Sequence, residues 1–437
     1  DAPKHHFNQA VMLKMKESIS KDSLSVVIKE LQRHHDMLRV NYPMKENTVI
    51  QMSHGTDFPI EVELVKLESV EELEVETNRC QSLFNISESP LMKVVLFKIA
   101  NEHDRLLIII HHLIVDGVSW RILLEDFNTI YKAKQKGLKP SLPLKTDSFK
   151  VYRDALESYK ESIVEQAEYW KEVISKVEIV PVDNEVKLRL RKNRKELKFN
   201  LSKEETQRLL EETNFAYNTQ INDLLLSVLS IALYKSFNME ESLITLEGHG
   251  REDVLGVDVS RTIGWFTTAY PVKLEYNRNR LEEQIKYTKE SLRAVPDKGI
   301  GYGVLKYMGE DELSYVPQIS FNYLGEFDKS VNNALFEWAS EGVGKPVGEE
   351  FTSEYKLDIN AMITKDEFSL SIAYDQFEFS DSRMHIFKED LKSTLIEVIE
   401  HCQRQESTVI TPSDISDEDF DIESLNEFLL DLDEGRA

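Results

Sequence analysis

Apolar segments of two different periods alternate along this 437-residue chain. Short, almost continuous apolar runs such as LMKVVLFKI, RLLIIIHHLIV and SLSIAYD are typical of buried strands. Other segments, such as SLSVVIKELQRHHDML and NDLLLSVLSIALYKSF, repeat apolar residues at three- and four-residue spacing and predict helices. The alternation predicts a mixed α/β protein. At roughly 150 residues per domain, the length allows about two or three compact units.

Net charge and cysteine content exclude several classes of protein. The 53 Lys and Arg residues stand against 78 Asp and Glu residues, and the resulting net charge of −25 repels a nucleic-acid backbone. Cys80 and Cys402 are too few for a disulfide framework and lack metal-ligand spacing, which favours the reducing cytoplasm. The sequence contains no run of 18 apolar residues, so we expect no transmembrane helix.

A crossover between two halves is expected near the middle of the chain. Residues 177–198 contain Pro181 and a basic run made of Lys187, Arg189, Arg191, Lys192, Arg194 and Lys195. The run lacks interleaved aromatic residues, so a solvated strand or a contact with an acidic protein partner fits it better than a nucleic-acid patch. We therefore expect an N-terminal unit over residues 1–180 and a C-terminal unit over residues 181–408. Because the chain starts with Asp1 rather than Met, we also expect it to be a piece of a longer polypeptide.

The remaining segment, residues 409–437, is strongly acidic. Between Ser413 and Gly435 it contains ten acidic residues and no basic residue. Its apolar residues recur at helical spacing at Ile422, Leu425, Phe428, Leu429 and Leu432. The pattern predicts a linker followed by an amphipathic helix, which could dock on its own domain or on a partner protein.

Common cofactor and nucleophile motifs are missing. Residues 342–345 resemble the end of a phosphate-binding loop, but Pro346 replaces the required Ser or Thr and the preceding glycine is absent. The glycines of residues 299–303 do not have dinucleotide-binding spacing, and no serine lies in a G-x-S-x-G elbow. The sequence therefore indicates neither nucleotide binding nor covalent catalysis.

A polar cluster follows a strongly apolar segment. Leu106 to Ile110 predict a buried strand, and the next residues, from His111 to Trp120, read HHLIVDGVSW and lead into a helix. Strand ends often present catalytic side chains, and imidazole can exchange protons at neutral pH. From composition alone, the favoured interpretation is that these histidines are core residues, a catalytic pair comes second, and a metal site with Asp116 comes last.

The HHxxxDGxSW segment resembles the signature of condensation and epimerization domains of nonribosomal peptide synthetases. Further matching motifs follow in family order: RHHDMLR (33–39), EGHGRE (247–252), RTIGWFTTAYPV (261–272), PDKGIGYG (296–303) and FNYLGEFD (321–328). Ser119-Trp120, Glu247 and the Asn322–Gly325 block resemble the epimerization branch, including starter-module domains of the gramicidin and tyrocidine type. The resemblance implies an α/β (α+β) fold of two chloramphenicol-acetyltransferase-like lobes, forming a V-shaped pseudo-dimer with the active-site channel between them.

The resemblance also implies a reaction. Such domains invert the α-carbon of an L-aminoacyl or peptidyl thioester carried on the 4′-phosphopantetheine arm of a peptidyl carrier protein, without a bound cofactor or metal. Inversion needs a base on one face of the α-carbon and an acid on the other. His112 and Glu247 are the expected pair, and Tyr323 is a competing candidate for the second group. Asn322 and Tyr323 are expected to supply hydrogen bonds.

Supporting roles are expected for residues around this pair. His111 is expected to pack and orient its loop, and Asp116 and Arg251 to form an ion pair between the lobes. Arg261 is expected to brace the lobes. The implied partners are an upstream carrier protein and, through the acidic segment, a downstream condensation domain. The alternatives are a condensation or acyltransferase domain, in which His112 would assist attack by an amine, and a catalytically silent docking module.

Overall fold

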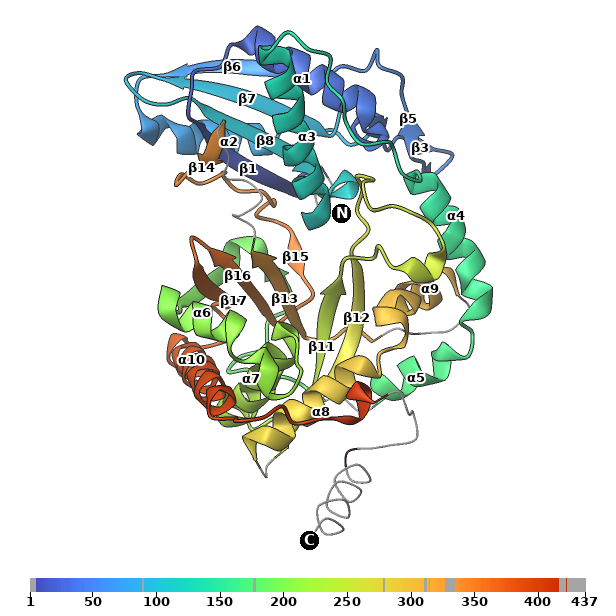
Figure 1. Cartoon of the computed structure of the whole chain (residues 1–437), viewed down its shortest axis with the longest axis vertical. Helices are drawn as coiled ribbons and strands as arrows, with labels where there is room; N and C mark the ends of the chain where they lie inside the picture. The colour runs from blue at the N-terminus through green and yellow to red at the C-terminus, as the bar shows by residue number, and fades with distance from the viewer. Residues whose placement is uncertain are drawn as a thin grey trace.

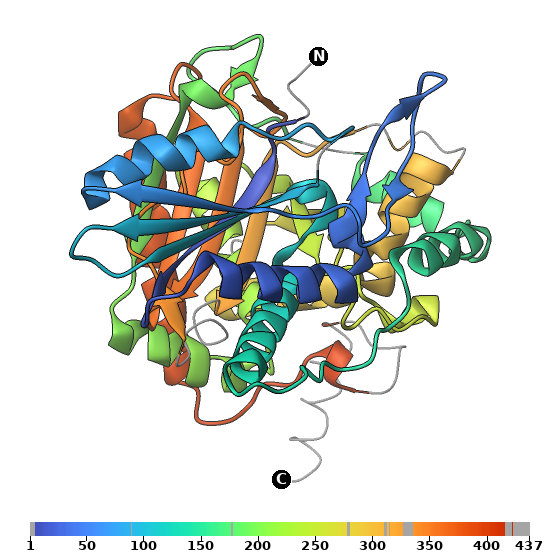
Figure 2. The ribbon, with the colours of Figure 1, turned by 90° about the horizontal axis from the view of Figure 1, so that it is seen from above.

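Two β-sheets organise the chain, and they are stacked along the long axis of the molecule (Figure 1). The computed structural model describes residues 5–88, 90–175, 178–277, 280–309, 313, 315–326, 335–415 and 422. Seen from above, the blue strands of the first sheet lie over the orange strands of the second (Figure 2). No described helix is long and apolar enough to cross a bilayer.

The first sheet has the strand order β14-β1-β8-β7-β6. Its strands are β1 (Asn8–Met15), β6 (Val62–Leu67), β7 (Met92–Ile99), β8 (Arg105–His111) and β14 (Phe336–Trp338). Every residue of β8 is buried, as the continuous apolar run predicts. Helices α1 (Lys21–His34) and α3 (Gly117–Gln135) pack against each other on this sheet (Figure 1).

The second sheet has the strand order β10-β17-β16-β13-β11-β12. Its strands are β10 (Arg194–Asn200), β11 (Glu241–Gly248), β12 (Thr268–Glu275), β13 (Ile319–Glu326), β16 (Leu357–Thr364) and β17 (Glu367–Asp375). The three central strands β11, β13 and β16 are parallel. Residues of β16 alternate between buried and half-buried, so one face meets the core and the other is partly open.

The apolar face of the second sheet is covered by helices α6 (Lys203–Glu211), α7 (Ile221–Phe237), α8 (Leu281–Arg293) and α10 (Asp381–Gln403) (Figure 1). The flank is formed by α4 (Phe149–Tyr159), α5 (Gln166–Val173) and α9 (Ile300–Met308). The remaining elements are α2 (Leu73–Gln81) and the short strands β2 (Val40–Asn41), β3 (Met44–Lys45), β4 (Thr48–Val49), β5 (Met52–Ser53), β9 (Arg189–Leu190) and β15 (Thr352–Ser353).

Two segments cross the expected division at residue 180. Ile163, Ala167 and Trp170 precede that boundary but are buried in the core of the second sheet. In the other direction, β14 pairs with β1 and completes the first sheet. The division into residues 1–180 and 181–408 therefore stays a prediction of the main units, and each unit contributes residues to the core of the other.

Several cations of the basic run near the crossover bind acidic side chains of the chain itself. Arg189 makes two hydrogen bonds, of 2.7 and 2.6 Å, with the carboxylate of Glu378, which is fully buried. Arg194 binds Asp358 at 2.7 Å. These contacts provide no support for the expected acidic protein partner, because they use the cations internally.

The start of the acidic segment also departs from expectation. Residues 409–415 were expected to belong to a linker, yet they pack on the second unit. The Val409 amide donates to the Ala216 carbonyl, and Asp414 accepts two hydrogen bonds of 2.7 Å from buried Lys289. A buried ammonium group requires such a partner, which explains the close docking. The expected amphipathic helix over Ile422 to Leu432 lies outside the described residues, apart from Ile422.

Candidate active site

His112 lies where the expected strand ends. Strand β8 ends at His111, and a single 3-10 turn, η3 (His112–Ile114), connects it to α3. The His112 amide donates to the Phe7 carbonyl at 2.9 Å, which continues the antiparallel pairing between β1 and β8. His111 is buried, and its ring accepts a hydrogen bond from the Leu113 amide. This contact orients the turn that carries His112.

The imidazole of His112 is enclosed by aromatic and polar side chains. It lies 5.2 Å from the Phe7 ring and 4.2 Å from the Trp265 ring, measured between centroids. Its Nε2 atom is 3.0 Å from the amide nitrogen of Gln9, whose oxygen accepts from the indole of Trp120 at 2.8 Å. Burial lowers the pKa of His112, although nearby backbone carbonyls and Asp116 oppose the shift. The ring is therefore held neutral near pH 7.

Glu247 and Asn322 meet on adjacent parallel strands. Leu246 of β11 is paired with Phe321 of β13, so the next residues on the two strands are neighbours. The Asn322 amide donates to the Glu247 carboxylate at 2.6 Å. Glu247 keeps contact with solvent, but the surrounding protein desolvates it, and this effect together with the charge of Asp358 raises its pKa to about 7.

Tyr323 differs from Asn322 in both position and chemistry. Successive strand residues point to opposite faces, and the half-buried Tyr323 side chain packs against the core of the second sheet. Burial, with a smaller effect of Glu326, raises the pKa of its phenol to about 12. The structure thus brings Asn322, and not Tyr323, to the Glu247 carboxylate, and it gives Tyr323 a proton that is difficult to remove at neutral pH.

Asp116 and Arg251 form the expected ion pair. Two guanidinium nitrogens of Arg251 donate to the carboxylate at 2.7 and 3.1 Å. Both side chains are buried, with 2% and 7% of their surfaces exposed. Asp116 also accepts from the Ser119 amide, which caps α3, and from the Phe266 amide.

This ion pair fixes the relation between the two site loops. Asp116 follows His112 by four residues, and Arg251 follows Glu247 by four residues. Four residues span at most about 14 Å, so His112 and Glu247 are each tethered within that reach of one shared contact. His112 comes from the end of the first sheet and Glu247 from the end of a strand in the second. An imidazole on the turn after β8 and a carboxyl group at the end of β11 are therefore joined through the ion pair that follows each of them.

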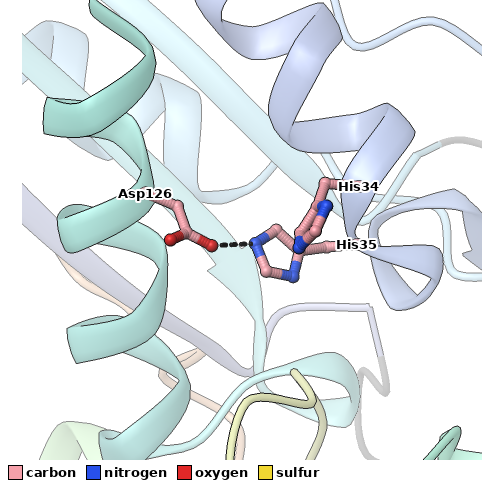
Figure 3. Close-up of side chains that lie close together, drawn as sticks. All are labelled: His34, His35 and Asp126. Carbon is pink, nitrogen blue, oxygen red and sulfur yellow. Dashed lines mark hydrogen bonds and ion pairs between the residues drawn. The ribbon is translucent and has the colours of Figure 1, made fainter. Parts of the chain in front are cut away.

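A second cluster of titratable side chains lies at the C-terminal end of α1. His34, His35 and Asp126 offer ligand atoms within 4.8 Å of one another (Figure 3). However, one oxygen of Asp126 accepts from His35 at 2.9 Å, and the other accepts from Arg261 at 2.6 Å. Arg261 also binds Glu125, so it braces α3 against the loop after β11, as expected. A cation would have to displace these donors.

Comparison with known proteins decides the family. Residues 1–420 match the condensation-domain family. The chain belongs to this family. It is 39% identical to a mycosubtilin synthase from Bacillus subtilis over 97% of its length, and 35% identical to gramicidin S synthase 1 of Brevibacillus brevis, also over 97%. It spans 17% and 41% of those two relatives, so it resembles one part of much longer proteins.

Solved structures confirm the expected fold. The epimerization domain from the third module of tyrocidine synthetase B is 34% identical, with a TM-score of 0.86 over 92% of this chain and 93% of that one. The first condensation domain of the CDA synthetase shares the fold at 12% identity, with a TM-score of 0.66 and 92% coverage of both chains. The chain is thus a condensation-superfamily domain with the chloramphenicol-acetyltransferase-like architecture, and it closely resembles an epimerization domain.

Sequence reasoning missed several residues around His112. Phe7 precedes β1, Gln9 lies within it, and Trp265 belongs to the RTIGWFTTAYPV motif, yet the sequence alone assigns none of them a role at the site. The motif containing Trp265 carried a signal that could have found it. Gln9 carried none beyond its place in a strand, because its contact with His112 joins residues 103 positions apart.

Proposed function

We propose that this domain epimerizes an L-aminoacyl or peptidyl thioester on the 4′-phosphopantetheine arm of a carrier protein. The observation that carries the proposal is the pair of titratable groups on the two segments that the Asp116–Arg251 ion pair joins. His112 has a lowered pKa, and Glu247 has a pKa of about 7. Near pH 7, a neutral imidazole and a protonated carboxyl group therefore coexist, and these are the base and the acid that inversion requires.

The proposed chemistry is a proton exchange through an enolate. One group removes the α-proton of the thioester, and the other delivers a proton to the opposite face of the planar intermediate. If His112 is the base, the product state contains an imidazolium and a Glu247 carboxylate, which is the state needed for the reverse reaction. Asn322 holds one carboxylate oxygen of Glu247 and leaves the other available for the proton.

Tyr323 takes a lesser part in this proposal. A phenol with a pKa of about 12 is a poor base at neutral pH, and its ring packs against the core of the second sheet. Asp116 and Arg251 act by holding the two loops in place, since each uses its charge on the other. His111 acts similarly on the turn before His112. Catalysis itself is thus assigned to His112 and Glu247.

A condensation activity would leave part of this arrangement unused. Formation of an amide bond needs one group to assist the attacking amine, and His112 could serve there. It does not need a second titratable group with a pKa of about 7, such as Glu247 of the second sheet. The 34% identity to an epimerization domain, against 12% to a condensation domain of the same fold, also supports inversion.

The proposed partners follow from the substrate. An upstream carrier protein presents the thioester, and a downstream condensation domain accepts the D-product. We assign the acidic segment a role in that second contact, because its charge would steer a basic partner. An aromatic residue such as phenylalanine is the proposed side chain.

The test uses a carrier protein loaded with L-phenylalanine on its 4′-phosphopantetheine arm. The domain is added in D₂O, and the thioester is hydrolysed and analysed for chirality and for α-deuterium. Epimerization predicts D-phenylalanine carrying deuterium at the α-carbon. A condensation domain would instead form a dipeptide when an aminoacyl acceptor is added, without α-deuterium. Absence of both D-product and deuterium would refute the proposal for this substrate.

A further inference from the structure

The contacts of His112 define which ring nitrogen carries the proton. An indole nitrogen can only donate, so the Trp120 ring must point its N–H at the oxygen of the Gln9 amide. This contact fixes the orientation of the amide, and the Gln9 nitrogen then faces Nε2 of His112 at 3.0 Å. Because an amide nitrogen is also only a donor, Nε2 must be the acceptor.

We propose that Gln9, oriented by Trp120, is a positioning residue that holds His112 in the tautomer with an unprotonated Nε2, whose electron pair accepts the Gln9 N–H until the substrate displaces it. The proton of the neutral ring then resides on Nδ1, which is buried without a well-aligned hydrogen-bond partner among the residues that the structure describes, although backbone groups of His112 and Val115 act on the ring and favour its protonation. The catalytic consequence rests on the proposed function, since the electron pair on Nε2 is the one that would take the α-proton of the substrate. The assignment of the tautomer itself does not depend on any activity.

The surroundings of the ring support a fixed orientation. Phe7 and Trp265 lie close to the His112 ring, and the Phe7 ring stacks in turn on Phe351 at 5.3 Å. Rotation of the imidazole by a half turn would place Cε1 near the Gln9 amide and remove the hydrogen bond. Packing and hydrogen bonding therefore select the same ring orientation, as a proton acceptor in an active site requires.

The same contact opposes protonation of the resting ring. A proton on Nε2 would point at the Gln9 amide hydrogens, and two donors would then face each other. The charged group that acts on His112 in the described part of the chain is Asp116, and Arg251 already neutralises it. Gln9 thus keeps Nε2 of His112 unprotonated in the resting state. The hydrogen bond from Gln9 to Nε2 must break when the substrate binds.

Replacement of Gln9 by glutamate reverses the hydrogen-bonding requirement. In Gln9→Glu, one carboxylate oxygen can still accept from Trp120, and the other needs a donor, so His112 should carry its proton on Nε2. The Trp120→Phe variant instead preserves Gln9 but releases the amide, which should give a mixture of tautomers. Gln135→Glu is the matched control, because it adds the same charge at the far end of α3, about 22 Å along the helix from Trp120.

The measurement is the ¹⁵N spectrum of the full chain labelled in its 11 histidines, with the His112 signals assigned by their loss in His112→Asn. We expect an unprotonated Nε2 in the wild type and in Gln135→Glu, a protonated Nε2 in Gln9→Glu, and an average in Trp120→Phe. A protonated Nε2 in the wild type, or an unchanged spectrum in the folded Gln9→Glu variant, would overturn the proposal. If Gln9→Glu does not fold, an unchanged tautomer in Trp120→Phe overturns it as well.

The catalytic consequence has a separate readout. We expect Gln9→Glu to lower kcat for inversion about 10- to 100-fold, with a small change in KM, because the base is misprotonated while the channel keeps its shape. Because the tautomer ratio of a neutral imidazole does not depend on pH, the rate of Gln9→Glu should stay low as pH rises, whereas that of Gln135→Glu should follow the wild type. A wild-type chain that shows the expected tautomer but no inversion would refute the proposed function and leave the positioning role intact.

Discussion

The guanidinium of Arg251 meets the carboxylate of Asp116 through two hydrogen bonds of 2.7 and 3.1 Å, and both side chains are buried. Arg251 also lies 4.1 Å above the centre of the Phe266 ring, whose backbone amide donates to the same carboxylate. The pair is therefore embedded in a network that joins the start of α3 to the loop after β11. Neither partner is free to transfer protons, so the pair serves the site by holding its loops.

Loss of either partner should destabilise the fold. Asp116→Ala or Arg251→Ala would leave one buried charge uncompensated, at a cost of roughly 3–5 kcal/mol. The double variant should lose much less stability than the sum of the losses in the two single variants. The second substitution removes the charge that the first leaves without a partner. Denaturant unfolding of the four proteins in a cycle measures this coupling. Arg404→Ala, which removes an exposed pair with Glu400, is the control and should change stability by less than about 1 kcal/mol. Additive losses would contradict the structural role.

Removal of the base or the acid should stop inversion of the α-carbon while still allowing exchange of the α-hydrogen in one enantiomer. His112→Ala and Glu247→Gln should each lower the rate of inversion by about 10²–10⁴, since each removes one positioned proton-transfer group. If the groups serve opposite faces, each variant should still exchange the α-hydrogen of the enantiomer that its remaining group can reach.

Carrier-bound L- and D-phenylalanine, each incubated in D₂O with each variant, provide the measurement. The two variants should differ in the enantiomer that they label. Equal loss of labelling from both enantiomers in both variants would mean that the two groups act in the same step, and inversion at the wild-type rate would exclude the pair.

The raised pKa of Glu247 also predicts a dependence of stability on pH. The folded state retains the proton up to a pKa of about 7, while the unfolded chain releases it near 4.5, so folding loses stability as pH rises through this window. Glu247→Gln removes this penalty. We expect its Tm to exceed that of the wild type by about 1–2 °C at pH 8 and to match it at pH 4.

Thermal unfolding at both pH values tests this expectation. Glu61→Gln is the matched control, because Glu61 is exposed and lies outside the site. Its Tm difference from the wild type should stay the same at pH 4 and pH 8. A Glu247→Gln variant that behaves in the same way as this control would show that the carboxyl group is not desolvated.

We expect the cluster of His34, His35 and Asp126 not to bind a metal ion. Both oxygens of Asp126 already bind donors, and the guanidinium of Arg261 lies against one of them. Burial, together with the nearby charges of Lys145 and Arg261, lowers the pKa of His34, so a further cation is disfavoured there. We therefore expect no change in Tm or inversion rate on addition of Zn²⁺ or EDTA. A rise in Tm with Zn²⁺ that is lost in His34→Ala would contradict this expectation.

The sequence predicted most of the features that depend on neighbouring residues and fewer of those that depend on contacts between residues far apart in the chain. The buried strand before His112 and helix α7 follow from apolar periodicity, which depends on neighbouring residues. The helix expected up to Leu38 ends at His34, where the chain passes into a 3-10 turn over Asp36–Arg39. The Asp116–Arg251 pair was accessible only because the family resemblance supplied the pairing of distant motifs.

Contacts without a local pattern could not be predicted. Trp170 appears in an ordinary amphipathic helix, and nothing in that helix indicates that it packs in the core of the second sheet. The strand β14 has only three residues, too few for a period to be recognised. Gln9 is an ordinary polar strand residue until folding brings it to His112. In each case the information lies in tertiary packing, which overrides local preference.

The contact between Lys289 and Asp414 determines where the acidic segment can be removed. The Lys289 side chain is 1% exposed, and its ammonium group binds both oxygens of Asp414 and the Tyr217 carbonyl. Deletion of residues 413–437 would remove Asp414 and leave this buried cation without its counterion, at a cost of roughly 3–5 kcal/mol. Deletion of residues 416–437 keeps the contact and should leave both stability and inversion unchanged.

Lys289→Met supplies the matched rescue for this pair of deletions. The methionine has a similar volume and no charge, so it should restore most of the stability that the longer deletion loses, as measured by denaturant unfolding. The shorter deletion then isolates the proposed role of the acidic segment. Transfer of the D-aminoacyl group to a downstream condensation domain should slow with this deletion, and the difference should shrink as salt rises above about 0.1 M, because the steering is electrostatic. Loss of inversion in the shorter deletion would instead place residues 416–437 among those that the domain needs for its own fold, and the docking role would have to be abandoned.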